Sequence, residues 1–218
     1  LFRSRDIHAG KGNDTISNKG ENSVAFGGAG NDAITNTGKN SNIAGGEGND
    51  NITNKGDSSV VEGGTGDDTV TNSGVSANVA GGAGNDNITN SGASSVINGG
   101  DGNDTVKNTG KNSTVDGGAG NDNITNSGTG TTINGGAGTD TLYFDYFPTE
   151  LGTISNISIT GIANSKNISD YGRNTLNANN TCPDLSTDAN LRAYNARPID
   201  LNSDLSCTFD NMNPTLDF

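Results

Sequence analysis

The chain has 218 residues, with 25 acidic residues against 12 basic ones and a formal net charge of −13. Leu, Ile, Val and Phe make up about 18% of it, too little for the single compact core of an ordinary globular enzyme. No run of even ten apolar residues occurs, so we expect no membrane insertion. The acidic balance argues against nucleic acid as a partner and favours cations.

After a short lead-in (residues 1–8), the chain is built on an 18-residue period. Six consecutive units without insertion or deletion fill residues 27–134. A divergent unit precedes them at 9–26, and a half unit follows at 135–143. Residues 9–143 therefore form a repeat array, and residues 144–218 form a segment of different composition.

Each unit has two halves of nine residues, as in GGAGNDNIT-NSGASSVIN. An aliphatic residue stands at the eighth place of each half, as at Ile34 and Ile43, between mostly polar neighbours. This alternation is typical of a short strand with one buried face, and the glycine-rich segments indicate tight turns. The pattern predicts an all-β fold, a β-solenoid with one 18-residue coil per unit.

The first half of each unit reads GGxGNDxUx, where U is aliphatic, and this nonapeptide is typical of calcium-binding β-rolls. Over residues 9–143 the chain resembles the RTX (repeats-in-toxin) family. The resemblance implies a parallel β-roll whose hexapeptide turns bind Ca²⁺ between successive coils.

The sixth residue of each such half supplies a carboxylate, and Ca²⁺ takes six to eight oxygen ligands. These candidate ligands are Asp14, Asp32, Asp50, Asp68, Asp86, Asp104, Asp122 and Asp140. Stacked without metal, they would repel one another. We expect the glycines at places one, two and four to adopt positive φ angles.

The resemblance implies that each ion takes two Asp carboxylates and backbone carbonyls of the glycines at places two and four. These glycines are Gly28, Gly30, Gly46, Gly48, Gly64, Gly66, Gly82, Gly84, Gly100, Gly102, Gly118 and Gly120. Eight stacked turns leave gaps for about seven ions.

The second half of each unit departs from this motif. It begins with Asn, has Gly at its third place, and carries Ser, Ala or Thr at its sixth place, never Asp. Without that carboxylate the turn cannot hold a divalent ion in the same way. We therefore expect calcium along one edge only, and stacked Asn amides and Ser hydroxyls bonded to the turn backbone along the other.

Outward positions around the first strand of each unit form a regular Thr and Asn grid. They are Thr35, Asn51, Thr53, Thr69, Thr71, Asn87, Thr89, Asn123 and Thr125. Such a grid resembles the surface of ice-binding proteins, one class of which is an RTX adhesin module. That class carries Thr inside the calcium turn, where this chain has it only at Thr65, and Lys107 interrupts the grid.

After the array, Tyr143, Phe144, Tyr146 and Phe147 form an aromatic cluster suited to cap the last coil. The remainder is expected to be β or irregular. Its two cysteines, Cys182 and Cys207, are the only ones in the chain, and we expect them to form a disulfide. The chain is therefore expected to be secreted or exposed at a cell surface.

No HExxH, no GxSxG and no Cys–His pair occurs, and His8 is the only histidine, so we expect no catalysis. The preferred function is a secreted, Ca²⁺-rigidified structural module of a cell-surface, matrix or filament assembly. It would have itself as a partner through head-to-tail stacking of its uncapped first coil. Two alternatives remain: an adhesin or ice-binding module using the flat Thr and Asn face, and the C-terminal secretion and folding module of an RTX enzyme or toxin.

Overall fold

The computed structural model describes residues 6–144 and 154–155. All 17 elements in these residues are β-strands. No helix in this part of the chain is long and apolar enough to cross a membrane.

The odd-numbered strands form a nine-stranded sheet, which we call sheet A. It comprises β1 (Ile7–Lys11), β3 (Val24–Ala29), β5 (Asn42–Glu47), β7 (Val60–Thr65), β9 (Asn78–Ala83), β11 (Val96–Asp101), β13 (Thr114–Ala119), β15 (Thr132–Ala137) and β17 (Ile154–Ser155). The even-numbered strands form an eight-stranded sheet, sheet B. It comprises β2 (Thr15–Asn18), β4 (Ala33–Asn36), β6 (Asn51–Asn54), β8 (Thr69–Asn72), β10 (Asn87–Asn90), β12 (Thr105–Asn108), β14 (Asn123–Asn126) and β16 (Thr141–Phe144).

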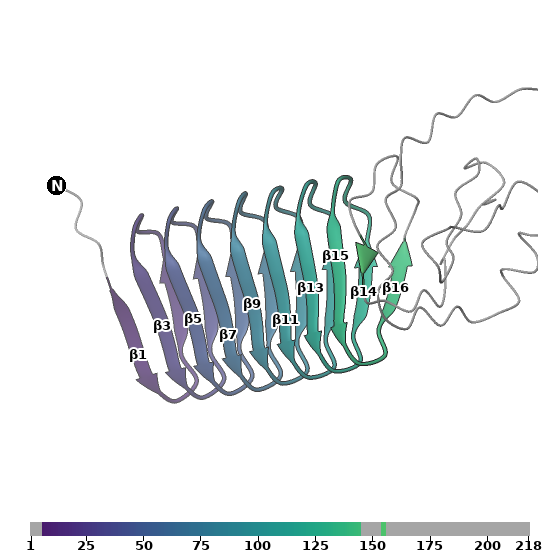
Figure 1. Ribbon diagram of the computed structural model, residues 1–218. Coiled ribbons are helices and arrows are strands. Elements are labelled where there is room, and N and C mark those ends of the chain that lie inside the picture. Colours follow the sequence, from purple (N-terminus) through teal and green to yellow (C-terminus); the bar gives the residue numbers. More distant parts are fainter. Residues whose placement is uncertain (1–5, 145–153, 156–218) are drawn as a thin grey trace, which may run out of the picture.

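The predicted parallel solenoid of 18-residue coils is confirmed. Every strand pair is parallel, and partners in the repeat array are offset by one unit, as in Ile34 opposite Ile52. The chain alternates between the two sheets, so each coil contributes one strand to each and stacks on the next coil along the rod (Figure 1). The equal unit length fixes this register, because an insertion would move the aliphatic side chain out of its row.

The core lies between the two sheets and holds one aliphatic side chain per strand. From sheet B come Ile16, Ile34, Ile52, Val70, Ile88, Val106, Ile124 and Leu142, all buried. From sheet A come Ala25, Ile43, Val61, Val79, Ile97, Val115 and Ile133, also buried. The predicted period-two pattern is therefore confirmed in both sheets.

The strands of sheet A are longer than the sequence suggests. In β3 the strand continues through Gly27 and Gly28, which we expected to belong to the turn. Gly28 pairs with Gly46 in the next coil, so these glycines extend the sheet and the turn begins only at Gly30. These residues belong to both the motif and the strand, because a glycine with a positive φ can still form the hydrogen bonds between neighbouring strands.

Sheet A also continues past the last repeat, because β17 pairs with β15 through Ile154 and Ile133. The remaining elements expected after residue 144, including Tyr146, Phe147 and the Cys182–Cys207 disulfide, lie outside the described residues.

Candidate metal centre

The candidate ligands lie in the turns that lead from sheet A to sheet B, along the lower edge of the rod in Figure 1. We call the eight predicted Asp residues the Asp column. One member falls in each coil because the unit length is constant. Asp14, in the first coil, is half-buried, and the other seven are buried and at most 2% exposed.

In seven carboxylates of the Asp column, those from Asp32 to Asp140, one oxygen accepts a hydrogen bond from the preceding coil. The backbone N–H of Asp50 donates to Asp68 Oδ1 at 2.7 Å, and that of Asp68 donates to Asp86 Oδ1 at 2.7 Å. The same bond recurs in every coil from Asp14 to Asp140, at 2.7–2.9 Å. These bonds fix the orientation of the seven carboxylates.

The other carboxylate oxygen has no partner. Seven Oδ2 atoms are buried without a hydrogen bond: those of Asp14, Asp32, Asp50, Asp68, Asp86, Asp104 and Asp122. A buried carboxylate oxygen without a donor or cation is costly, and buried polar groups in folded proteins are rarely left in that state. The column therefore offers a row of oxygen atoms that require protons or cations.

The first glycine of each motif leaves room beside this oxygen. A Cβ built on Gly27 would overlap Asp32 Oδ2 and would lie 2.6 Å from the Gly45 carbonyl oxygen of the next coil. The same crowding recurs at Gly45, Gly63, Gly81, Gly99 and Gly117. The expectation of a positive φ was wrong at this place: φ is positive at places two and four, as at Gly28 (118°) and Gly30 (124°), but not at place one. The first glycine is needed for space.

Burial raises the pKa values of six members of the Asp column: Asp50, Asp68, Asp86, Asp104, Asp122 and Asp140. Loss of hydration is the largest cause, and the neighbouring carboxylates add to it; the hydrogen bond to the preceding coil acts in the opposite direction. The pKa of Asp68 rises to about 7, and those of Asp104 and Asp122 to about 6. Loss of hydration and repulsion between neighbouring carboxylates therefore destabilise the ionised form of the column.

The donor atoms fit Ca²⁺. Six of the gaps between coils, those from Asp32 to Asp140, offer an unpaired carboxylate oxygen and, beside it, the carbonyl oxygen of the first glycine of the next coil, such as Gly45. These hard oxygen ligands suit Ca²⁺. Within the described residues no three His, Cys, Asp or Glu side chains converge on one point, so most ligands of an ion here would be backbone oxygens.

The glycines at places two and four were expected to supply carbonyl ligands. In the structure their carbonyl oxygens face along the rod, so that a Cβ on Gly46 would overlap the Gly28 oxygen and one on Gly48 would lie 2.5 Å from the Gly30 oxygen. Their role as ligands stays a prediction. The carbonyl of the first glycine was not among the expected ligands, because its position beside Oδ2 depends on how the coils stack.

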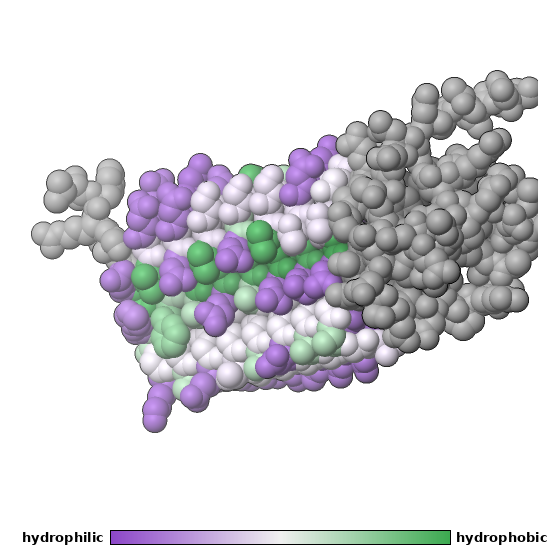
Figure 2. All heavy atoms as spheres, in the orientation of Figure 1, coloured by the Kyte–Doolittle hydropathy of each residue, from purple (hydrophilic) through white to green (hydrophobic). Residues whose placement is uncertain are grey.

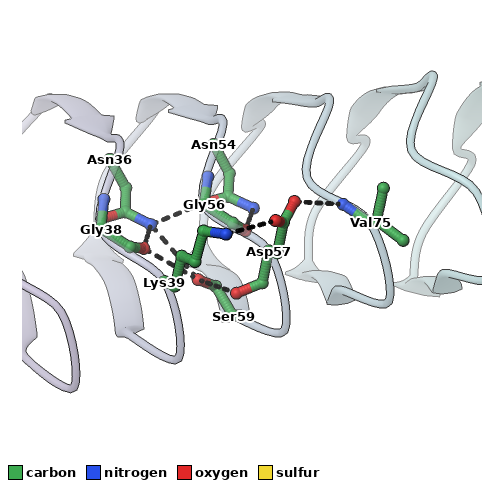
Figure 3. Close-up of polar contacts among 8 residues, drawn as sticks. All are labelled: Asn36, Gly38, Lys39, Asn54, Gly56, Asp57, Ser59 and Val75. Carbon is green, nitrogen blue, oxygen red and sulfur yellow. Dashed lines mark hydrogen bonds and ion pairs between the residues drawn. The ribbon is translucent and has the colours of Figure 1, made fainter.

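The opposite edge carries the predicted Asn ladder, which is confirmed (Figure 3). Asn36 Nδ2 donates to Asn54 Oδ1 at 2.7 Å, and Asn54 donates to Asn72 in the same way. Each amide also closes its own turn, as Asn54 does with the backbone N–H and carbonyl of Gly56. The amides from Asn18 to Asn126 are all buried and linked in this way.

The predicted Ser hydroxyl contacts lie beside this ladder and are confirmed. Ser59 Oγ accepts the Ser41 backbone N–H at 3.3 Å. It also donates to the Gly38 carbonyl at 3.3 Å (Figure 3). Ala77 occupies the same column without a hydroxyl and is equally buried. On this edge the buried amides and hydroxyls are neutral and bond to one another and to the turn backbone. In the described residues, every buried side-chain oxygen or nitrogen atom without a hydrogen bond belongs to the Asp column.

Asn72→Ala tests the neutral ladder. The substitution leaves Asn54 Nδ2 and Asn90 Oδ1 without their 2.7 Å partners and also opens the bonds to Gly74. We expect a loss of about 3 kcal/mol in the free energy of unfolding. Urea denaturation should give the same loss with calcium and with a chelator. Thr71→Ala, on the neighbouring exposed position, is the control and should change stability by less than about 0.5 kcal/mol.

Comparisons with known proteins give this chain no family. No protein-family model, no curated protein and no solved structure matches it. The structure is a parallel β-solenoid of 18-residue coils with one stacked Asp per coil, and this arrangement is consistent with a β-roll.

Proposed function

We propose that the solenoid is a calcium-binding structural module of an extracellular protein, and that Ca²⁺ bound between coils along the Asp column makes the rod rigid. The observation that carries this proposal is the row of seven buried Oδ2 atoms without partners. A divalent ion at each gap would neutralise two neighbouring carboxylates and supply the partner that each oxygen lacks. The resemblance of the GGxGND motif to RTX repeats supports calcium as that ion.

Extracellular calcium modules bind with dissociation constants of about 10⁻⁴ to 10⁻³ M, so this role suits an environment rich in calcium. The core is one aliphatic side chain per strand, which leaves stability dependent on the turns. Ion binding at the turns would therefore act on the part of the coil that hydrophobic burial stabilises least.

Assembly belongs to the same proposal. Among the described strands, β1 pairs only with β3, and β2 pairs only with β4. A parallel strand of another coil would continue both sheets in the same register. We propose the terminal coil of another copy as this partner, which would extend the rod into a filament.

Calcium binding can be tested by substituting one residue on each edge. Asp68→Ala removes a carboxylate that borders two gaps, whereas Ser59→Ala removes a hydroxyl from the neutral edge. Far-UV circular dichroism should show a higher melting temperature with calcium than with a chelator for wild type and for Ser59→Ala. Asp68→Ala should lose a substantial part of that increase. An equal effect of both substitutions, or a wild-type melting curve unchanged by chelator, would refute the proposal.

A second candidate function rests on the outer face of sheet B. The predicted Thr and Asn grid lies on this face, exposed or half-buried, in two columns that run along the rod. Sheet A differs, because its outer face carries exposed Val60 and Val96 and the hydropathy of its side chains alternates along the rod (Figure 2). Apart from Ala33 and Lys107, this face is from β4 to β14 a regular array of small polar side chains, which favours docking to a flat, ordered surface such as ice. An assay of ice recrystallisation decides this candidate.

A further inference from the structure

The first coil lacks the glycine that every later motif carries at place one. Its motif reads AGKGND, with Ala9 at this place. The later motifs carry Gly27, Gly45, Gly63, Gly81, Gly99, Gly117 and Gly135 there. Ala9 lies in β1 between two residues that pair with β3, because His8 is opposite Phe26 and Gly10 is opposite Gly28. The ladder therefore puts Ala9 at the level of the first glycine of the second coil.

A methyl group at place one cannot coexist with the two oxygen atoms that face a gap. In all six gaps from Asp32 to Asp140, a Cβ built on the first glycine would lie under 3.0 Å from the unpaired Oδ2 of its own coil. It would also lie under 3.0 Å from the carbonyl oxygen of the first glycine in the next coil. Real Cβ atoms essentially never come so close to another atom. A side chain at place one therefore forces at least one of the two oxygens away from the gap.

In the first coil, the carboxylate of Asp14 is the group that can move. The other seven members of the Asp column accept a backbone N–H from the preceding coil, and within the described residues Asp14 has no such bond. Asp14 is also only half-buried. The Gly27 carbonyl, by contrast, belongs to β3, which pairs with β1 on one side and β5 on the other. The methyl group of Ala9 therefore displaces the Asp14 carboxylate.

The gap between the first and second coils consequently differs from the six others. Ca²⁺ requires several oxygen ligands at about 2.3–2.6 Å, and a methyl group supplies none. Asp14 Oδ2 is buried without a hydrogen bond, as are the Oδ2 atoms of the next six members of the column. The carboxylate alone therefore does not distinguish this gap. The distinction lies in the space beside the carboxylate, which glycine leaves open in the other six coils and Ala9 fills.

We propose that the gap between Asp14 and Asp32 takes up no Ca²⁺, because the methyl group of Ala9 excludes the ion. The inference rests on the proposed calcium binding and makes this gap the exception to it. The calcium ladder then begins one gap later than the sequence motif suggests. Strand pairing and core packing, as of Ile16 at the level of Ile34, hold the first coil without an ion. The strands β1 and β2, which we propose to join another copy, thus belong to a coil that calcium does not bind.

Counting the calcium ions bound by the full chain tests the proposal. Ala9→Gly removes the methyl group, and we expect this variant to bind one ion more than wild type in equilibrium dialysis at saturating calcium. Lys11→Ala is the matched control, because it removes the exposed cation of the same turn and keeps the methyl group. Its number of ions should equal that of wild type. A gain with Lys11→Ala, or no gain with Ala9→Gly, would overturn the role of Ala9.

Asp14→Asn locates the additional ion. Made in wild type, it should leave the number of bound ions unchanged, because Asp14 borders only the gap that Ala9 closes. Made together with Ala9→Gly, it should abolish the gain. Loss of one ion from Asp14→Asn in wild type would show that the first gap is occupied and would overturn the proposal. Absence of calcium binding by wild type and by every variant would instead refute the proposed function.

Discussion

Asp68→Asn is expected to stabilise the metal-free protein and to destabilise the calcium-loaded protein. Without metal, the substitution removes a charge from a site where burial raises the pKa to about 7. The amide oxygen still accepts the Asp50 N–H, and the new NH₂ group replaces an oxygen that has no partner. We expect a gain of about 1–2 kcal/mol in chelator.

With calcium, Asp68→Asn removes a charged ligand from two gaps, and we expect the melting temperature to fall below that of wild type. Differential scanning calorimetry in chelator and in millimolar calcium measures both changes. Ser59→Ala is the control, because its effect should have the same sign and size in both conditions. A fall in both conditions for Asp68→Asn would show that the unpaired oxygen does not limit the stability of the metal-free coil.

The metal-free protein should lose stability as the pH rises from 4 to 8. The pKa values of Asp68, Asp104 and Asp122 are raised from 3.8 to about 7, 6 and 6, so the folded chain binds more protons than the unfolded chain in this range. Their contribution is fully present below the unfolded pKa and is lost as the pH rises through about 6 to 7. We expect the melting temperature in chelator to fall by about 10 °C between pH 4 and pH 8.

Calcium should reverse this dependence, because protons and calcium compete for the same oxygen atoms. In saturating calcium the melting temperature should rise between pH 4 and pH 7. Thermal melts over this range, with and without calcium, provide the comparison. A parallel pH dependence in both conditions would mean that calcium does not bind to the Asp column.

The fold could be predicted because one period governs both sequence and structure. Aliphatic residues at a single place in each half, such as Ile34 and Ile43, can be buried together only if each unit forms one coil. The Asn ladder was also predictable, since an Asn at the same place in every unit must meet its equivalents when coils stack. Repetition turns a local pattern into a long-range contact.

Features that depend on stacking geometry were not predictable in detail. The need for glycine at Gly27 arises from the next coil and from Asp32, and no backbone preference of the residue reveals it. Likewise, the backbone is left-handed at the fifth place of the second half of each unit, as at Asn22, Asn40 and Ser58. Asn, Ser and Gly all occur at this place, and this mixture of residues is only a weak indication of a left-handed conformation. In the first half of each unit, the fifth-place Asn side chain accepts a hydrogen bond from the backbone N–H of the next coil, as Asn31 does from Asn49. The near-constant Asn at this place indicated a structural role, but only the structure shows which group it bonds.

The constant register described for the two sheets has a consequence for the gene. Loss of 18 residues, such as 63–80, would bring Glu62 next to Gly81 and leave every remaining coil in contact with an equivalent neighbour. Loss of nine residues would instead bring an Asn turn to the edge where the Asp turns lie. Recombination between similar DNA repeats can therefore change the length of the rod in whole coils, and natural variants should differ in length by multiples of 18.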